Sequence, residues 1–200
     1  MKASDAKSSL TMGFLTVIEY PEYGLFGGYL LLNRLGRPLE FHCTAPIKPS
    51  RAQQILYGAT LHPFLYGEQI GRTLVATAKA APLAILTDRE PVLVLREFVE
   101  VPVVFVLDKE GAAKVGEGPV RETSEISEPP QIAYRVDPSH PAGSQMTPFH
   151  LGRNRLAVPS WAADDRQVVA AGLGELAESF DFLEPFERIR EAIEEARRGG

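Results

Sequence analysis

The sequence predicts an α+β protein, with a mainly antiparallel sheet of five to six strands, packed helices and a C-terminal pair of helices. Three observations predict this class. Short apolar runs separated by turn residues recur through residues 13–107, as is typical of strands. The stretch Ser50–Lys79 has helical character and divides these runs into two groups. Apolar residues near the C-terminus recur at steps of three and four, which indicates amphipathic helices.

The first group contains three predicted strands: Gly13–Glu19, Leu25–Asn33 and Arg37–Ala45. Gly36 lies between the second and third, where a short hairpin loop requires a residue that tolerates positive φ. These three segments therefore predict consecutive antiparallel strands.

The helical stretch begins with a recognisable cap. Ser50 and Gln53 have the spacing of a capping box, in which each side chain satisfies a free backbone N–H of the first turn. Further along, Gly67 and Gly71 give the helix a smooth face. Because glycine inside a helix is unfavourable, close packing is expected to compensate, and a sheet is the expected partner for that face.

The second group contains the predicted strands Leu83–Leu86, Val92–Leu95 and Val101–Leu107. Each is almost wholly apolar, as expected for strands covered on both faces. The connections Thr87–Pro91 and Arg96–Glu100 are short, which favours an antiparallel meander.

This hairpin–helix–three-strand order is similar to that of the profilin-like group, which includes longin and roadblock domains. The resemblance covers about half the chain and involves element order without a sequence motif. It implies a non-catalytic adaptor that works through its surface. The predicted organisation is a disordered leader over residues 1–11, a core domain over 12–108, an irregular Pro/Gly-rich excursion over 109–160 with one strand at Ile132–Val136, and C-terminal helices over 161–200.

The last quarter of the chain predicts two helices that pack on the core. The same apolar residues are candidates for binding a partner protein, because an amphipathic helix can lie in another protein's groove. The candidate partner-binding residues are Phe180, Phe182, Phe186, Ile189 and Ile193.

Composition limits the classes of function. The net charge of −5 and the lack of a basic cluster argue against a nucleic-acid partner. Cys43 is the only cysteine, so no intrachain disulfide can form, which fits a reducing compartment. No stretch has the roughly 18 apolar residues of a membrane span, and we expect a soluble cytoplasmic protein.

Few residues suggest chemistry, and no cofactor or metal site is predicted. His42 and Glu40 lie two apart on one strand, so they share a face and could form an acid/base pair. A surface role for both residues explains the pattern equally well. The adjacent Cys43 points to the other face and is expected to be a small buried hydrophobe.

The sequence therefore favours a non-enzymatic interaction or regulatory module, with another protein or a second copy as partner. The alternative is a hydrolase-type enzyme in which Asp88 or Glu97 converges with His42 and Glu40 in one pocket. A further alternative is a small-ligand sensor with a pocket between sheet and helix, and its polar handles would be Tyr57, Tyr66 and Tyr29.

Overall fold

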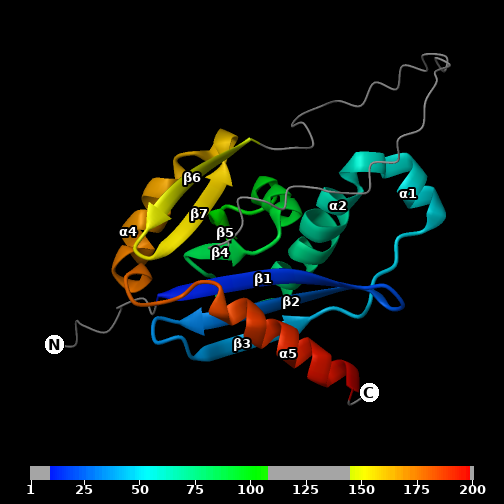
Figure 1. Cartoon of the computed structure of the whole chain (residues 1–200), viewed down its shortest axis with the longest axis horizontal. Helices are drawn as coiled ribbons and strands as arrows, with labels where there is room; N and C mark the ends of the chain where they lie inside the picture. The colour runs from blue at the N-terminus through cyan, green and yellow to red at the C-terminus, as the bar shows by residue number, and fades with distance from the viewer. Residues whose placement is uncertain (1–9, 108–144, 199–200) are drawn as a thin grey trace, which may run out of the picture.

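The chain forms a seven-stranded mixed sheet with helices on both faces (Figure 1). The computed structural model describes residues 10–107 and 145–198. The strand order is β3-β2-β1-β4-β5-β7-β6. The α+β class agrees with the sequence prediction, whereas the prediction of a mainly antiparallel sheet of five to six strands is wrong.

The first three strands are β1 (Thr11–Tyr20), β2 (Gly24–Asn33) and β3 (Pro38–Cys43), and they pair antiparallel as predicted. Gly36 has a φ of 70° in the β2–β3 turn, a conformation that glycine adopts without strain. β1 and β2 are covered on both faces, which explains their nearly continuous apolar sequences.

The next two strands overturn the expected meander. β4 (Ala84–Thr87) lies parallel to β1, and β5 (Val103–Leu107) lies parallel to β4. The chain between them forms a 3-10 helix, η3 (Glu90–Glu97), so the predicted strand Val92–Leu95 is wrong. A parallel pair needs a crossover, which η3 supplies. The hairpin–helix–three-strand order, and with it the profilin-like resemblance, does not hold.

The helical stretch contains five segments: α1 (Arg51–Tyr57), η1 (Gly58–Thr60), α2 (Leu61–Pro63), η2 (Phe64–Gly71) and α3 (Arg72–Thr77). The capping box is confirmed. Ser50 Oγ accepts a hydrogen bond from Gln53 N at 3.2 Å, and Ser50 N donates to Gln53 Oε1 at 2.9 Å. Segment η2 is a π-helical stretch, a wider helix that often occurs near functional sites.

The two helical glycines pack against a partner other than the expected sheet. A Cβ on Gly67 would lie 2.1 Å from Val94 Cγ1, and one on Gly71 would lie 3.3 Å from Leu95 Cδ2. Both neighbours belong to η3. The smooth face therefore lets one helix approach another, while glycines on β2 let the helices approach the sheet.

The sheet gains two strands that the sequence did not predict, β6 (Met146–Leu151) and β7 (Asn154–Pro159). They form a hairpin that joins the sheet through β7 and β5. A short turn, η4 (Ser160–Ala162), leads to α4 (Asp165–Ala177) and α5 (Glu184–Arg198), the predicted C-terminal helices. The proposed strand Ile132–Val136 and the leader lie outside the described residues, and the division into domains stays a prediction.

The sheet separates two apolar cores. On one face, α4 and α5 cover Phe14, Leu86 and their neighbours. On the other face, η2, α3 and η3 cover Leu15, Ile85 and Val103. Within the described residues, no helix is both long enough and apolar enough to cross a bilayer.

Candidate functional site

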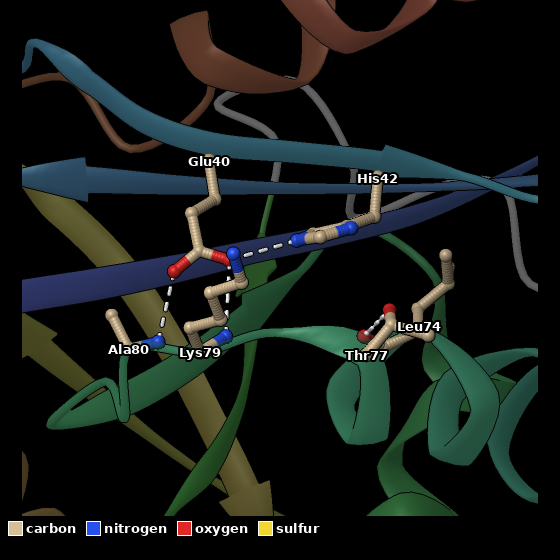
Figure 2. Close-up of polar contacts among 6 residues, drawn as sticks. All are labelled: Glu40, His42, Leu74, Thr77, Lys79 and Ala80. Atoms are coloured by element: carbon tan, nitrogen blue, oxygen red, sulfur yellow. Dashed lines mark hydrogen bonds and ion pairs between the residues drawn. The ribbon is translucent and has the colours of Figure 1, made fainter.

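Glu40 and His42 point from β3 toward the end of α3, where they form a hydrogen-bonded pair (Figure 2). Glu40 Oε2 lies 2.9 Å from His42 Nε2. The same carboxylate accepts hydrogen bonds from Lys79 N at 3.0 Å and from Ala80 N at 2.8 Å. The period of two in a strand puts both side chains on one face, as the sequence predicted. The sequence did not predict the two hydrogen bonds that Glu40 accepts from the chain after α3.

These hydrogen bonds hold Glu40 in its ionised form. The Lys79 N–H, followed by His42, lowers the pKa of Glu40 from its usual 4.5 to about 2. Glu40 is therefore a carboxylate near neutral pH and can only accept hydrogen bonds. A carboxylate only accepts, so His42 Nε2 carries the shared hydrogen, and Nδ1 is the ring nitrogen that could act as a base. Within the described part of the chain, no hydrogen bond reaches that nitrogen.

A cavity of about 520 Å³ lies beside His42. One wall is formed by residues 41–47, at the end of β3 and just beyond it. The opposite wall comes from η2 and α3, through Gln69, Thr73, Leu74 and Thr77. The cavity is large enough for a small organic molecule.

Most polar groups of the cavity wall already have partners. The hydroxyls of Thr73 and Thr77 donate to helix carbonyls at 2.6 and 2.7 Å, and Thr44 Oγ1 accepts from Gly27 N at 3.0 Å. Gln69 Oε1 has no hydrogen-bond partner, but this oxygen is buried and does not open to the cavity. The hydroxyl hydrogens of Thr73 and Thr77 are therefore used within the protein, and a ligand would meet these oxygens only as acceptors.

Cys43 also lines this cavity, and its exposure contradicts the expectation of a small buried hydrophobe. β3 is an edge strand of the sheet, so only one neighbouring strand covers it. The thiol is consequently accessible from solvent.

Asp88 does not join the Glu40–His42 pair. It follows β4 and forms a close ion pair with Arg190 of α5, on the opposite face of the sheet. Its side chain is 9% exposed. Glu97 lies at the exposed end of η3, which packs on η2 and β5. The four-residue hydrolase site proposed from the sequence is thus not assembled, and the pair on β3 remains.

The three candidate tyrosine handles lie at separate places outside the cavity wall. Tyr29 is fully buried on β2 with its hydroxyl over Gly13, and burial raises its pKa. Tyr57 stacks on Phe64 with ring centroids 4.2 Å apart, whereas Tyr66 packs near His62. A pocket between strand and helix exists, as the sensor hypothesis requires, but other residues form it.

The candidate partner-binding residues lie within the core of their own chain. Phe182, Phe186 and Ile189 are fully buried, and Ile193 is 2% exposed. Phe14 of β1 contacts this cluster, with ring centroids 5.6 Å from Phe186 and 6.4 Å from Phe180. Docking of the C-terminal helices onto the core accounts for these apolar side chains. Their role in binding a partner stays a prediction.

A second cavity, of about 500 Å³, lies along α5 and carries charged residues. Its side chains are largely engaged with one another: Tyr20 donates to Glu194 Oε2 at 3.0 Å, and Arg198 pairs with the same carboxylate at 3.2 Å. Within residues 10–107 and 145–198, no three His, Cys, Asp or Glu side chains form a group able to hold a metal ion. The β3 cavity is therefore the better candidate site.

The sequence reasoning missed Gln69, Thr73 and Thr77. Their spacing of four places them on neighbouring turns of one helical face. That spacing marks a polar stripe but gives no sign that the stripe faces β3.

Comparison with known proteins finds only weak structural similarity. No protein-family model matches the chain, and no curated protein matches it. Among solved structures, endonuclease V of Ciona intestinalis in complex with a 23mer DNA containing an inosine followed by a ribo-adenosine has a TM-score of 0.34 and 12% identity. The human endonuclease V structure has a TM-score of 0.26 and 14% identity. Each match covers 50% of this chain and 46% of the other, so the matched part spans less than half of these relatives.

These likenesses contradict two predictions from the sequence. The chain was expected to be a non-enzymatic interaction module and to have no nucleic-acid partner, yet both similar structures are endonucleases and one contains DNA. We therefore withdraw the non-enzymatic assignment and the exclusion of nucleic acid. At these TM-scores the likenesses carry no argument for a particular substrate of this chain.

Proposed function

We propose that this protein is a hydrolase-type enzyme that acts on a small molecule bound in the β3 cavity. His42 is the general base, and Glu40 is a positioning residue. The observation that carries the proposal is the 2.9 Å hydrogen bond between them at the cavity wall, with Glu40 held as a carboxylate by two backbone N–H groups.

The arrangement supports the following reaction. His42 Nδ1 takes a proton from a water molecule, and the water oxygen forms a bond to the electrophilic carbon of the substrate. The resulting imidazolium is stabilised by the adjacent carboxylate of Glu40. As the bond to the leaving group breaks, His42 returns the proton to that group. General base catalysis of this kind contributes roughly 10²- to 10⁴-fold in rate.

A sensor that binds a ligand without chemistry is the second candidate. It is favoured by the bonds from Glu40 to Lys79 N and Ala80 N, which tie β3 to the chain that follows α3. A ligand bound between β3 and α3 would contact the segments that these hydrogen bonds connect. Its binding would thereby shift β3 and be transmitted to the rest of the sheet. Under either function we propose a cytoplasmic location, supported by the unpaired thiol of Cys43.

Hydrolysis of neutral and charged p-nitrophenyl esters and of bis-p-nitrophenyl phosphate tests the proposal. We expect His42→Ala to lower kcat/KM by about 10²-fold or more for the substrates that are turned over. Glu40→Gln should also lower it, because the imidazolium loses its carboxylate. His150→Ala is the matched control, since His150 is exposed on β6 at the other edge of the sheet. Turnover that is equal in wild type and His42→Ala would refute His42 as the base.

A further inference from the structure

The outer side of β3 is an unpaired strand edge. β3 is the last strand of the sheet, and among the described residues only β2 forms strand pairs with it (Figure 1). Thr44 N donates to Gly27 O of β2 at 3.0 Å, and backbone groups alternate in direction along a strand. The N–H and C=O groups of Phe41 and Cys43 therefore point away from β2, where they are available to another strand.

β3 has few of the features that normally protect an edge strand from pairing. It contains no lysine or arginine, and its one proline is Pro38 at its first position. The irregularity in the β2–β3 register lies next to Pro38, and residues 40–43 pair regularly with β2. Leu39 is 47% exposed and Phe41 is 39% exposed, and the exposed Cys43 lies on the same face. The edge thus presents unpaired backbone groups together with apolar side chains.

The sequence of β3 complements itself when a second copy of the strand runs antiparallel to it. Residues 39–43 read Leu-Glu-Phe-His-Cys, with the carboxylate and the imidazole at equal distances from Phe41. In a pair centred on Phe41, Glu40 therefore lies opposite the partner's His42, and the two Phe41 rings face each other. Opposed acidic and basic side chains and opposed aromatic rings both stabilise a strand pair.

The neighbouring registers lack this complementarity. A pair centred on Glu40 would oppose two carboxylates, and like charges directly opposite each other are destabilising. A pair centred on His42 would oppose two imidazoles. In the register centred on Phe41, each Glu40 can also take a further donor. It accepts three hydrogen bonds within its own chain, and a carboxylate has room for about four.

We infer that β3 pairs antiparallel with β3 of a second copy of this chain, around a two-fold axis at Phe41, so that the two sheets join into one. Phe41 N of each copy donates to Phe41 O of the other, since these groups point outward from both strands. The same surface serves both copies, as a two-fold interface requires. Two short strands bury little surface, as in weak and transient complexes, so we expect the dimer only near 100 µM protein, to order of magnitude about.

Sedimentation velocity of the full chain from about 10 to about 200 µM tests the dimer. We expect the dimer fraction to rise with concentration in wild type. Phe41→Lys should stay monomeric, because it puts two ammonium groups opposite each other at the two-fold axis. Leu35→Lys is the matched control, since Leu35 is an apolar residue 76% exposed in the turn before β3, and it should dimerise as wild type does. A monomeric wild type, dimers of Phe41→Lys, or equal loss in both variants would overturn the inference.

Oxidative cross-linking tests the register. In Phe41→Cys combined with Cys43→Ser, the two thiols belong to a hydrogen-bonded pair with Cα atoms about 5.5 Å apart, within the disulfide range of about 4.4–6.8 Å. The Cys43 residues of two wild-type copies would lie four strand positions apart, or roughly 14 Å. With copper phenanthroline as oxidant, we expect disulfide-linked dimers of the double variant and few of wild type. Equal cross-linking of both proteins, more in wild type, or none in either would overturn the register. The wild-type sedimentation result stands even where a variant folds poorly.

Discussion

Replacing Gly27 by Ala is expected to disturb the β3 cavity from within the sheet. Gly27 lies on β2 beneath the helices, and a Cβ there would lie 2.2 Å from Ile70 Cγ2 and 2.9 Å from Leu74 Cδ1. Ile70 is β-branched and belongs to η2, so its methyl group cannot turn away freely. The segment that contains Gln69 and Leu74 must move outward, and the cavity changes with it.

The size of the effect follows from these contacts. Carbon atoms pack at about 3.5–4.0 Å, so Ile70 must shift by about 1.5 Å. Overpacking of this kind typically costs about 1–3 kcal/mol, whereas replacing a strand glycine by alanine otherwise gains roughly 0.5–1 kcal/mol. We expect Gly27→Ala to lower the free energy of unfolding by about 1–2 kcal/mol.

Gly28→Ala is a matched control on the opposite face of the same strand. Its Cβ would lie 2.3 Å from Ile189 Cγ2 and 2.9 Å from Ile193 Cδ1, both on α5. The two variants should lose similar stability in urea unfolding. Only Gly27→Ala should change the rate at which 4,4′-dithiodipyridine reacts with Cys43, the exposed thiol that lines the cavity. If both variants change this rate equally, or if Gly27→Ala leaves it unchanged, the proposed link between the Gly27 contacts and the cavity is refuted.

Three further predictions concern stability. Asn154→Ala removes hydrogen bonds to Ala177 O, Phe180 O and Phe182 N and should lower the free energy of unfolding by about 3 kcal/mol in urea; a loss below about 1 kcal/mol would contradict this. Asp165→Asn weakens a bidentate pair with Arg96 and should cost roughly 3 kcal/mol, with little dependence on salt in the same assay. The lowered pKa of Glu40 implies that its stabilising contribution is complete above about pH 4.5 and is lost as the pH falls toward 2; Glu40→Gln should flatten this acid limb, and an unchanged limb would contradict it.

The N-terminal half of the fold could be predicted because its signals are local. The strands around Gly36 and the cap at Ser50 depend on residues within a few positions of one another. The strand at Val92–Leu95 failed because four apolar residues fit a buried strand and a buried helix equally well. In the structure, Pro91 lies near the start of η3, and Val92 and Leu95 form its buried side.

The unpredicted hairpin β6–β7 shows a different difficulty. Its strands include Pro148 and Arg155, which weaken the apolar pattern that marks a strand. Gly152, with a φ of 55°, is the turn residue and the clearest local signal. β6 is an edge strand, where a proline is tolerated because one side needs no ladder hydrogen bonds.

Half of the candidate site, the pair on β3, could be predicted from local sequence signals. The period of two on β3 predicts that Glu40 and His42 share a face, and no other residue is needed to reach that conclusion. Gln69 belongs to a helix that returns to β3 from elsewhere in the fold. The contact between them depends on tertiary packing, which the periodicity of either element leaves undetermined.

The crossover after α3 explains why Glu40 meets Lys79 and Ala80. β4 lies three positions from β3 in the sheet, which is about 14 Å at a strand spacing of ~4.8 Å. The chain from Lys79 to Ala84 can reach about 17 Å when extended, so it has little slack. It must leave α3 beside β3 and run beneath the sheet, with Leu83 N bonded to Thr11 O at 2.8 Å near its far end. The span is set by the strand order, in which β4 lies beside β1 at three places from β3, so the hydrogen bonds from Lys79 N and Ala80 N to Glu40 depend on that order.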